Sequence, residues 1–272
     1  MPHGTTIRPV RSDLHRIVLQ LDNGVSDMAS NYEAHESGSH SRVGVALSSA
    51  LDKALAMQRE PIAKHVERVR RARPGDPPSE IIRRLERQYL AAVTASGAGV
   101  GGAAAAPGVG TGVALALSIG EVGAFLEAST LLTLAIAEVH GLRIDDLERR
   151  RTLVLAIVLG DSGSKAVEKV ARRTGQHWAR KVVEAVPIEA IRAVNKVLGR
   201  NFLTKFGTKE GIVVLGRLVP FGIGAAIGGA ANAAFGQTVI RATRRAFGDP
   251  PPSWVRERPQ HRADSDGPAS EA

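Results

Sequence analysis

Two long stretches without a charged residue constrain the fold of this chain more than any other feature. The first lies between Arg87 and Glu121, and the second lies between Arg217 and Arg241. Uncharged stretches of this length are typical of membrane spans and of deeply buried helices. Both are rich in glycine and alanine, which let helix backbones approach closely. We therefore expect tightly packed helices, either in lipid or in a soluble core.

The composition limits the cellular compartments and the kinds of binding site that are possible for this chain. The 272 residues include no cysteine, which excludes disulfides and thiolate metal sites and fits a reducing compartment. The formal net charge of +9 favours anionic partners such as lipid headgroups. Aromatic residues are few, so the stacking surfaces that single-stranded nucleic acid needs are absent. Charged residues are scattered through the first 23 positions, so we expect no signal peptide.

Apolar residues recur at helical spacing, and alternating β patterns are nearly absent. The sequence predicts an all-α fold of packed helical hairpins with Gly/Ala-rich, membrane-compatible helices. Three regions are expected: a mobile polar arm over residues 1–42, a helical domain over residues 43–248, and a disordered tail over residues 249–272. The tail is rich in proline and charge, a composition that does not support a packed core.

Turn and cap residues predict where the helices begin and end. Ser79 is expected to be an N-cap, and Gly141 a left-handed C-terminal cap. Asp145 and Glu148 have the spacing of a capping box, and Gly160 closes the helix that they open. We predict helices over residues 111–139, 146–159, 165–186 and 187–198, and an apolar helical region over 211–247 that is interrupted near Pro220.

Glycines at four-residue spacing mark faces on which helices can pack closely. Gly97, Gly99 and Gly102 also match the G-x-G-x-x-G pattern of dinucleotide-binding proteins, but a helical segment precedes them where that motif requires a strand. We therefore interpret the glycines as helix-packing positions, the alternative being a flexible loop. The pairs are Gly97 with Gly101, Gly108 with Gly112, and Gly224 with Gly228.

The apolar helix after Pro107 has the length of a membrane span, but it contains two acidic residues. Glu121 and Glu127 near the centre of a bilayer would cost about as much free energy as the apolar side chains contribute. A hairpin that enters the bilayer and returns fits this balance better than two spans. Arginines precede and follow the hairpin, which places both of its ends on the cytoplasmic side. The alternative is a soluble helical core flanked by solvated arginines.

The residues with catalytic or metal-binding potential do not form a recognisable set. Glu127 and Glu138 share an angular position on a helix, an arrangement more typical of solvated or paired carboxylates than of acid–base catalysis. None of the eight histidines has metal-ligand spacing, and Ser118 and Ser162 lack the surroundings of a nucleophile elbow. His140, beside Gly141, is interpreted as a helix C-terminal residue favoured by the dipole. We assign no catalytic, cofactor or metal site.

One helical surface is strongly basic and is a candidate for contact with a membrane. Trp178 follows it and is placed at the headgroup level in this interpretation. The alternatives are a solvated helix face and a nucleic-acid surface, for which no known DNA-binding motif is present. The basic residues are Lys165, Lys169, Arg172 and Arg173.

Four segments carry a resemblance to a known family. They are LERQYLAAVTASGAGVGGAAAAPGVGT, EVGAFLEASTLLTLAIAEVHG, LRIDDLERRRTLVLAIVLGDSG and LVPFGIGAAIGGAANAAFGQTVIRATRRAF. Their order and their Pro-Gly, Val-His-Gly and Asn-Ala-Ala-Phe motifs resemble the bacterial EcsC family over about residues 43–247. The resemblance implies a helical protein whose molecular activity is unassigned, encoded near a transporter, with no catalytic residues to carry over.

These observations lead to one functional hypothesis and two alternatives. We expect a non-enzymatic, membrane-associated protein at the cytoplasmic face of a bacterial membrane, supporting a transport or envelope process. Its partner is then membrane lipid or a membrane protein, and nucleic acid is not expected. The first alternative is a soluble, cytoplasmic helical interaction protein with a small-residue core. The second is an unrecognised hydrolase that uses the helix carboxylates.

Overall fold

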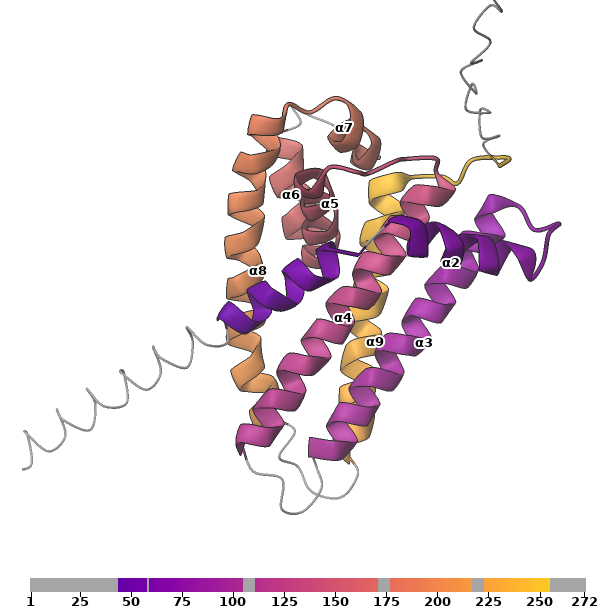
Figure 1. The fold of residues 1–272 in the computed structure, drawn as a ribbon. Helices are drawn as coiled ribbons and strands as arrows, with labels where there is room; N and C mark the ends of the chain where they lie inside the picture. The colour runs from indigo at the N-terminus through magenta and orange to yellow at the C-terminus, as the bar shows by residue number, and fades with distance from the viewer. Residues whose placement is uncertain (1–43, 58, 105–110, 171–176, 217–222, 255–272) are drawn as a thin grey trace, which may run out of the picture.

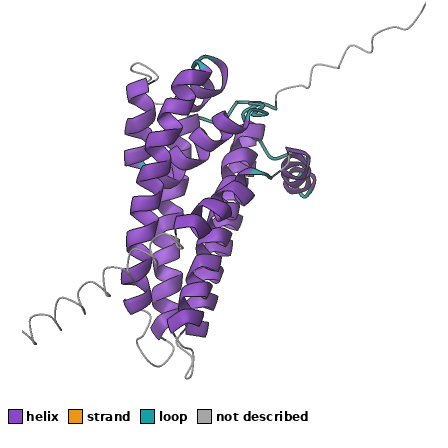
Figure 2. Cartoon of the chain, turned by 60° about the vertical axis from the view of Figure 1, so that its left-hand side comes forward, coloured by secondary structure: helices purple, strands orange, loops and turns teal. Residues whose placement is uncertain are grey.

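The computed structural model describes residues 44–57, 59–104, 111–170, 177–216 and 223–254, and over these residues it contains helices and loops but no strand (Figure 1, Figure 2). The predicted all-α fold is confirmed. A helix over residues 44–55 comes first. The helices after it are α2 (Arg59–Arg71), α3 (Pro78–Ala104), α4 (Thr111–Val139), α5 (Leu147–Leu159), α6 (Asp161–Val170), α7 (Trp178–Glu184), α8 (Ile188–Gly216) and α9 (Ile223–Phe247).

Long helices from opposite ends of the sequence form the centre of the bundle. The most extensive helix contact joins α3 to α9, and α3 also packs along α4. Helix α5 packs against α8 and α6 at one end of the bundle, and α2 projects to the side there (Figure 1). The other end is formed by the C-terminal part of α3 and the N-terminal parts of α4 and α9, which extend beyond the short helices.

Helix α5 is the centre of the hydrophobic core. Every residue from Thr152 to Leu159 is buried, so this part of the helix has no solvent-facing side, whereas Leu147 in its first turn is exposed. A helix that is apolar on all sides must be enclosed by other elements. Its one buried cation, Arg150, donates hydrogen bonds to the carbonyl oxygens of Leu55 at 3.0 Å, Met57 at 2.6 Å and Ile144 at 3.0 Å. These bonds fix the end of the first helix against the loop before α5.

Gly141 ends α4 as the sequence predicted. Its φ of 68° lies in the left-handed region, which favours glycine. Its N–H donates to the Glu138 carbonyl oxygen at 3.0 Å, and the Leu142 N–H donates to the Ala137 carbonyl oxygen at 2.9 Å. This pair of bonds is a Schellman motif, which satisfies the free carbonyl groups at the end of a helix. The predicted bounds of this helix, 111–139, are confirmed.

Two predicted N-caps are wrong by one or two residues. Helix α3 begins at Pro78, and Pro77, not Ser79, accepts the first hydrogen bonds through its carbonyl oxygen. Proline suits the first helical position because it has no N–H to leave unpaired. Helix α5 is capped by Asp146, not Asp145, and its carboxylate accepts a hydrogen bond from the Arg149 N–H at 2.8 Å. Two adjacent aspartates offer the same cap chemistry, so spacing alone did not separate them.

Two other predicted helices have different extents in the structure. The helix predicted over 165–186 begins four residues earlier, at Asp161, and its second part is a separate helix, α7. Helix α8 does not end at Leu198 but continues to Gly216. It passes Gly199 without a break because Leu198, Phe202 and Phe206 continue one buried apolar face at four-residue spacing. Pro220 and Pro107 lie outside the described residues.

The start of the expected disordered tail is ordered. Residues 249–254 are described, and Trp254 is half-buried beside the turn between α2 and α3. Its indole N–H donates to the Asp76 carbonyl oxygen at 3.4 Å. The guanidinium of Arg70 lies 4.5 Å from the centre of the indole ring, which is a cation–π contact. This contact holds the chain after α9 against α2.

Candidate functional site

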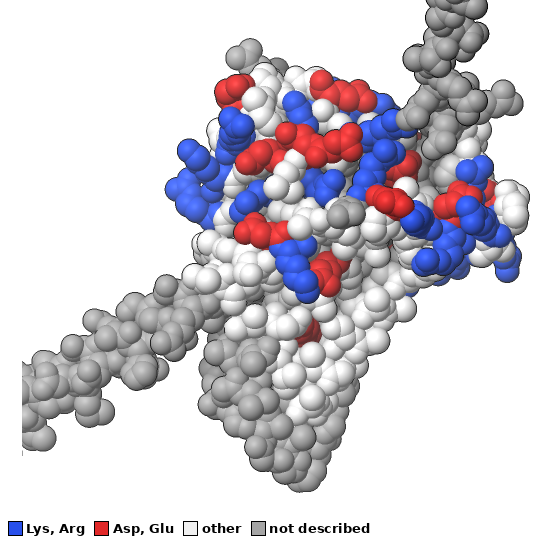
Figure 3. Space-filling model, in the orientation of Figure 1, with Lys and Arg blue, Asp and Glu red and all other residues white. Residues whose placement is uncertain are grey.

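The charged side chains of the bundle are gathered at one end. In Figure 3 lysine, arginine, aspartate and glutamate crowd the end that carries α2 and α5–α7, whereas the lower part of α3 and α4 shows almost none on this face. We call the uncharged part the stem and define it as residues 88–104 of α3, 111–126 of α4 and 223–240 of α9. The rest of the bundle is the charged end. The stem so defined contains one charged residue, Glu121.

The exposed face of the stem part of α3 consists of uncharged residues, most of them small. At a rise of 1.5 Å per residue, the stem part of α3 is about 25 Å long. Soluble proteins normally place charges over a surface of this length. Among the stem residues of α3 whose side chains are described, the exposed positions are Gln88, Ala91, Ala92, Ala95, Gly99 and Ala103.

Inside the stem, α3 and α9 touch backbone to backbone. A β-carbon on Gly97 would lie 2.5 Å from the carbonyl oxygen of Gly228 and 2.6 Å from Nδ2 of Asn232. A β-carbon on Gly228 would meet the Gly97 carbonyl oxygen and would lie 3.4 Å from Cα of Gly101. Real β-carbons do not approach other atoms so closely, so only glycine fits at Gly97 and Gly228. The glycines pair across two helices that are far apart in the sequence.

The other glycines singled out by spacing lie nearer the tip of the stem. Gly112 and Gly224 are in the first turns of α4 and α9, where the structure describes the helix alone. Gly108 lies outside the described residues.

One amide side chain connects the three stem helices. Nδ2 of Asn232 in α9 donates to the Val93 carbonyl oxygen in α3 at 3.0 Å and to Oε1 of Glu121 in α4 at 2.9 Å. Both side chains are buried, and Glu121 is only 6% exposed. The carboxylate of Glu121 therefore points into the helix bundle and away from the outer surface. Because it is buried, Glu121 does not add the full bilayer cost that its position in the sequence had suggested.

The remaining carboxylates of α4 have separate partners. Glu127 forms an ion pair with Lys53 at 2.9 Å, and both side chains are well exposed. Glu138 accepts hydrogen bonds from Arg59 at 3.1 and 3.3 Å. The three acids of α4 thus have three different environments, and each has its own hydrogen-bond or ion-pair partner. Nothing in their arrangement brings a pair of carboxylates together for acid–base catalysis.

The basic surface predicted after Gly160 is only partly described. Lys165 and Lys169 are exposed on α6, and Arg172 and Arg173 lie outside the described residues. Trp178 does not lie at a surface, because its side chain is fully buried in the core against neighbouring helices. Its expected role at the headgroup level is therefore wrong. The sequence placed it on one face of a long basic helix, but α7 begins at this residue and packs it inward.

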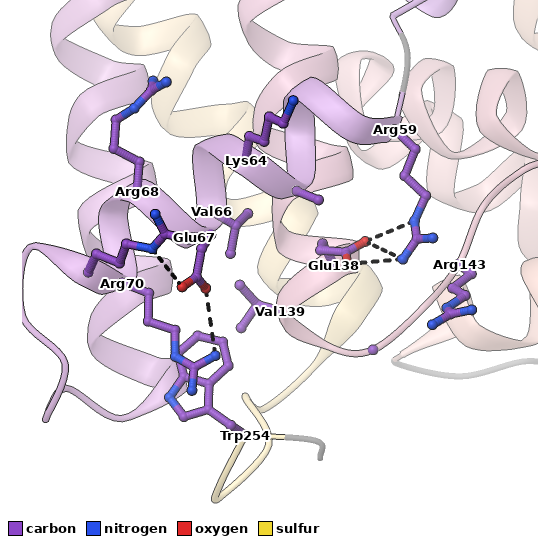
Figure 4. A pocket seen from close by; sticks show the side chains of 13 residues that line it. Arg59, Lys64, Val66, Glu67, Arg68, Arg70, Glu138, Val139, Arg143 and Trp254 are labelled. Atoms are coloured by element: carbon purple, nitrogen blue, oxygen red, sulfur yellow. Dashed lines mark hydrogen bonds and ion pairs between the residues drawn. The ribbon is translucent and has the colours of Figure 1, made fainter. Parts of the chain in front are cut away.

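A groove that sequence reasoning missed lies in the charged end, beside α2. It has a volume of about 1220 Å³ and is bordered by α2, the end of α4, Arg143 and Trp254. Figure 4 shows charged side chains on both sides of a floor that contains Val66 and Val139. Its cationic lining residues are Arg59, Lys64, Arg68, Arg70, Arg71 and Arg143, and its acidic ones are Glu67 and Glu138.

Both carboxylates of the groove are already engaged. Glu138 is held by Arg59, as described above, and Glu67 accepts from Nε of Arg71 at 3.1 Å and lies 3.7 Å from Arg70 (Figure 4). No ion pair or side-chain hydrogen bond to a described residue satisfies Arg68 or Arg143. The only sequence signal for the groove is the basic run VERVRR in α2, since Arg143 and Trp254 come from distant segments.

Among the described residues, one helical segment is long and apolar enough to cross a membrane. It runs from Ile119 to Val139, with a mean hydropathy of 1.6, and 67% of it is buried inside the protein. Burial of this extent is equally a property of a core helix in a soluble bundle. The segment therefore does not separate the two interpretations of the uncharged stretches.

Comparison with known proteins identifies no relative of this chain. No family model matches the chain, and neither a curated protein nor a solved structure is significantly similar to it. The resemblance to the EcsC family stays a prediction from the sequence motifs.

Proposed function

We propose that this protein is a non-enzymatic, membrane-associated helical protein of the EcsC type that inserts its stem into the cytoplasmic face of a bacterial membrane. In this role it supports a transport or envelope process. The observation that carries the proposal is the segregation of charge between the two ends of the bundle (Figure 3). Along its normal, a bilayer has an apolar core and then a polar headgroup layer. Along its length, the protein has an uncharged stem and then a charged end.

The stem is long enough to pass through one leaflet without spanning the bilayer. Its length of about 25 Å exceeds one leaflet, since the hydrocarbon core of a bilayer is about 30 Å thick. Backbone groups in lipid must be satisfied internally, as they are along the interior of an α-helix. Glu121, the one acidic residue of the stem, is buried and accepts a hydrogen bond from Asn232. Intramembrane carboxylates generally face the bundle interior in this way.

The surroundings of the stem also fit an interface. Arg83 and Arg87 are exposed on the part of α3 that lies just before the stem. Cations at this position would meet the phosphate layer when the stem is inserted. Helix α8 reaches toward the same end of the bundle, and its sequence includes Lys209 and Glu210 in the last two turns. Insertion of the stem therefore requires a tilt that keeps the end of α8 out of the hydrocarbon core.

A soluble helical interaction protein is the second candidate, and the burial of α4 favours it. In that case the uncharged face of α3 would be covered by another protein. The same glycine contact between α3 and α9 serves both candidates, because small residues allow close packing in either medium. The two candidates differ in what covers the exposed alanines of α3.

Vesicle flotation of the full-length protein tests the proposal. The protein should float with neutral phosphatidylcholine vesicles, and Ala95→Lys, on the exposed face of the stem, should weaken binding by at least about tenfold, because a lysine in the hydrocarbon core is costly. Ala193→Lys, at an exposed position of α8 in the charged end, is the matched control and should bind like the wild type. A wild-type protein that stays with the soluble fraction contradicts the proposal. If Ala95→Lys then also disrupts an oligomer, the soluble interaction protein is favoured.

A further inference from the structure

We propose that the groove beside α2 binds a phosphate group carried by a small organic molecule or a lipid. This site lies in the charged end, apart from the stem, and adds a ligand class to the proposed membrane association. The inference stands on the geometry of the groove and does not require that the stem inserts.

The groove has an uncompensated positive charge. Six cationic side chains and two carboxylates line it, an excess of four positive charges in one cavity. The low-dielectric wall of a concave surface focuses such a field and raises the local concentration of anions. Most basic faces of helices are convex and solvated, whereas this one is hollowed and is closed at one edge by Trp254.

The ion pairs of the groove leave specific cations available. Arg59 is held by Glu138, and Glu67 interacts with both Arg70 and Arg71. Lys64 pairs with Glu60 at 2.5 Å, an interaction within α2 between two highly exposed side chains. Among the described residues, no partner of this kind is present for Arg68 or Arg143, which line the same cavity from α2 and from the loop after α4. In Figure 4 these two side chains lie at opposite margins of the groove and do not converge, so each offers a separate guanidinium group to an anion.

The side-chain chemistry selects phosphate among anions. Five of the six cations are arginines, whose planar guanidinium groups bind phosphate or carboxylate oxygens through two parallel hydrogen bonds. A phosphate ester carries close to two negative charges near neutral pH, which matches the charge excess better than a single carboxylate does. The volume of about 1220 Å³ is larger than inorganic phosphate needs. Val66 and Val139 provide a floor for the organic part of the ligand.

The fluorescence of Trp254 can report whether the groove holds a ligand. It lines the groove, while Trp178, the other tryptophan of the chain, is fully buried in the core. Titration with glycerol 3-phosphate at constant ionic strength should give a saturable change in fluorescence. The change should be absent in Trp254→Phe, and calorimetry on the same samples should give the dissociation constant.

Two charge-matched double variants decide whether the groove is the site. Arg68→Gln with Arg143→Gln should weaken binding by about tenfold or more, because each removes a charged hydrogen-bond donor. Lys165→Gln with Lys169→Gln removes the same charge from α6 and should leave the dissociation constant unchanged. Equal losses in both variants, or no saturable binding to the wild type, would overturn the proposal. Circular dichroism of each variant confirms that the helices are intact.

Vesicles distinguish the two sources of the phosphate. If a lipid headgroup is the ligand, adding phosphatidic acid to phosphatidylcholine vesicles should strengthen binding, and the arginine variant should lose only this gain. If a soluble ester is the ligand, phosphatidic acid should strengthen vesicle binding of the wild type no more than that of the arginine variant. Failure to bind neutral vesicles would contradict the insertion of the stem and would leave the glycerol 3-phosphate titration as an independent test of the groove.

Discussion

The charged end and the stem of this bundle are packed by different means. In the charged end, large side chains fill the space between helices, with Trp178, Leu155 and Ile157 fully buried. In the stem, glycines bring the backbones of α3 and α9 into direct contact, and one amide from Asn232 connects the helices. Packing in the charged end depends on the volume of large side chains, whereas packing in the stem depends on glycines that have no side chain. The two ends should therefore respond oppositely to changes in residue size.

The partners of buried carboxylates also differ between the charged end and the stem. Glu86, only 5% exposed at its side chain, is held by Arg244 in the charged end, where Arg244 is 61% exposed. The hydrogen bond that Arg244 donates to Glu86 is the main reason that the pKa of Arg244 is raised. Within the stem, Glu121 accepts a hydrogen bond from an uncharged amide. The charged end is thus built for contact with water, whereas the stem keeps its one charged residue inside.

A large-to-small change in the charged end should have the largest effect. Leu155→Ala removes a fully buried side chain from α5 and should lower the free energy of unfolding by about 2–5 kcal/mol, since the cavity cannot collapse among enclosed helices. Chemical denaturation monitored by circular dichroism measures the change. Leu155→Met, which nearly conserves volume, should cost less than about 1.5 kcal/mol. Equal effects of both variants would show that α5 is loosely packed.

A small-to-large change in the stem should come next. Gly97→Leu forces apart two backbones and should cost about 3 kcal/mol, the upper end of the usual penalty for overpacking. Gly99→Leu is the matched control, because no atom lies within 4 Å of a β-carbon there. That control should be neutral or stabilising, since leucine favours helix more than glycine does. If both variants melt like the wild type, close packing does not hold the stem together.

The amide of the stem should have an intermediate effect. Asn232→Ala removes the donor to Glu121 and to the Val93 carbonyl oxygen and should cost about 1–3 kcal/mol. A double-mutant cycle with Glu121→Gln isolates the coupling between the two side chains. We expect Glu121→Gln alone to preserve any cellular phenotype, because the glutamine can still accept the hydrogen bond. Loss of function with normal folding in that variant would instead favour the hydrolase interpretation.

The smallest expected effect is a change of stability with pH that comes from His140. Burial, followed by the charges of Arg180 and His177, lowers the pKa of His140. A lowered pKa in the folded state means that acidification protonates the unfolded chain first. Stability should therefore be full above the ordinary pKa of about 6.5 and should fall as the pH drops below it. His140→Gln should flatten this part of the stability profile, and an unchanged slope would exclude His140 as its source.

The parts of the fold that the sequence predicted are those with local causes. The bounds of α4 follow from an apolar run and a glycine cap, and both are local signals. The extent of α8 was missed because Gly199 is a local break signal that the buried face through Phe202 overrides. The N-cap at Asp146 was missed because its neighbour has the same chemistry.

The candidate sites depend on residues that the sequence separates. The groove joins α2 to Arg143 and Trp254, and the last of these was expected in a disordered tail. The glycine positions could be selected by spacing, but their partners could not, because Gly97 meets Gly228 in another helix. The two uncharged stretches could be recognised in the sequence. Only the three-dimensional structure shows that both of them lie at the same end of the bundle.

The pairing of α3 with α9 has a consequence for how the chain is made. Val93 and its partner Asn232 are 139 residues apart in the sequence. A ribosome adds about 5–20 residues per second, so α3 is made roughly 7–30 seconds before α9 is complete. During that interval the glycine-lined face of α3 has no α9 to cover it. The nascent protein must be shielded by α4, a chaperone or a membrane surface until translation reaches the last helix.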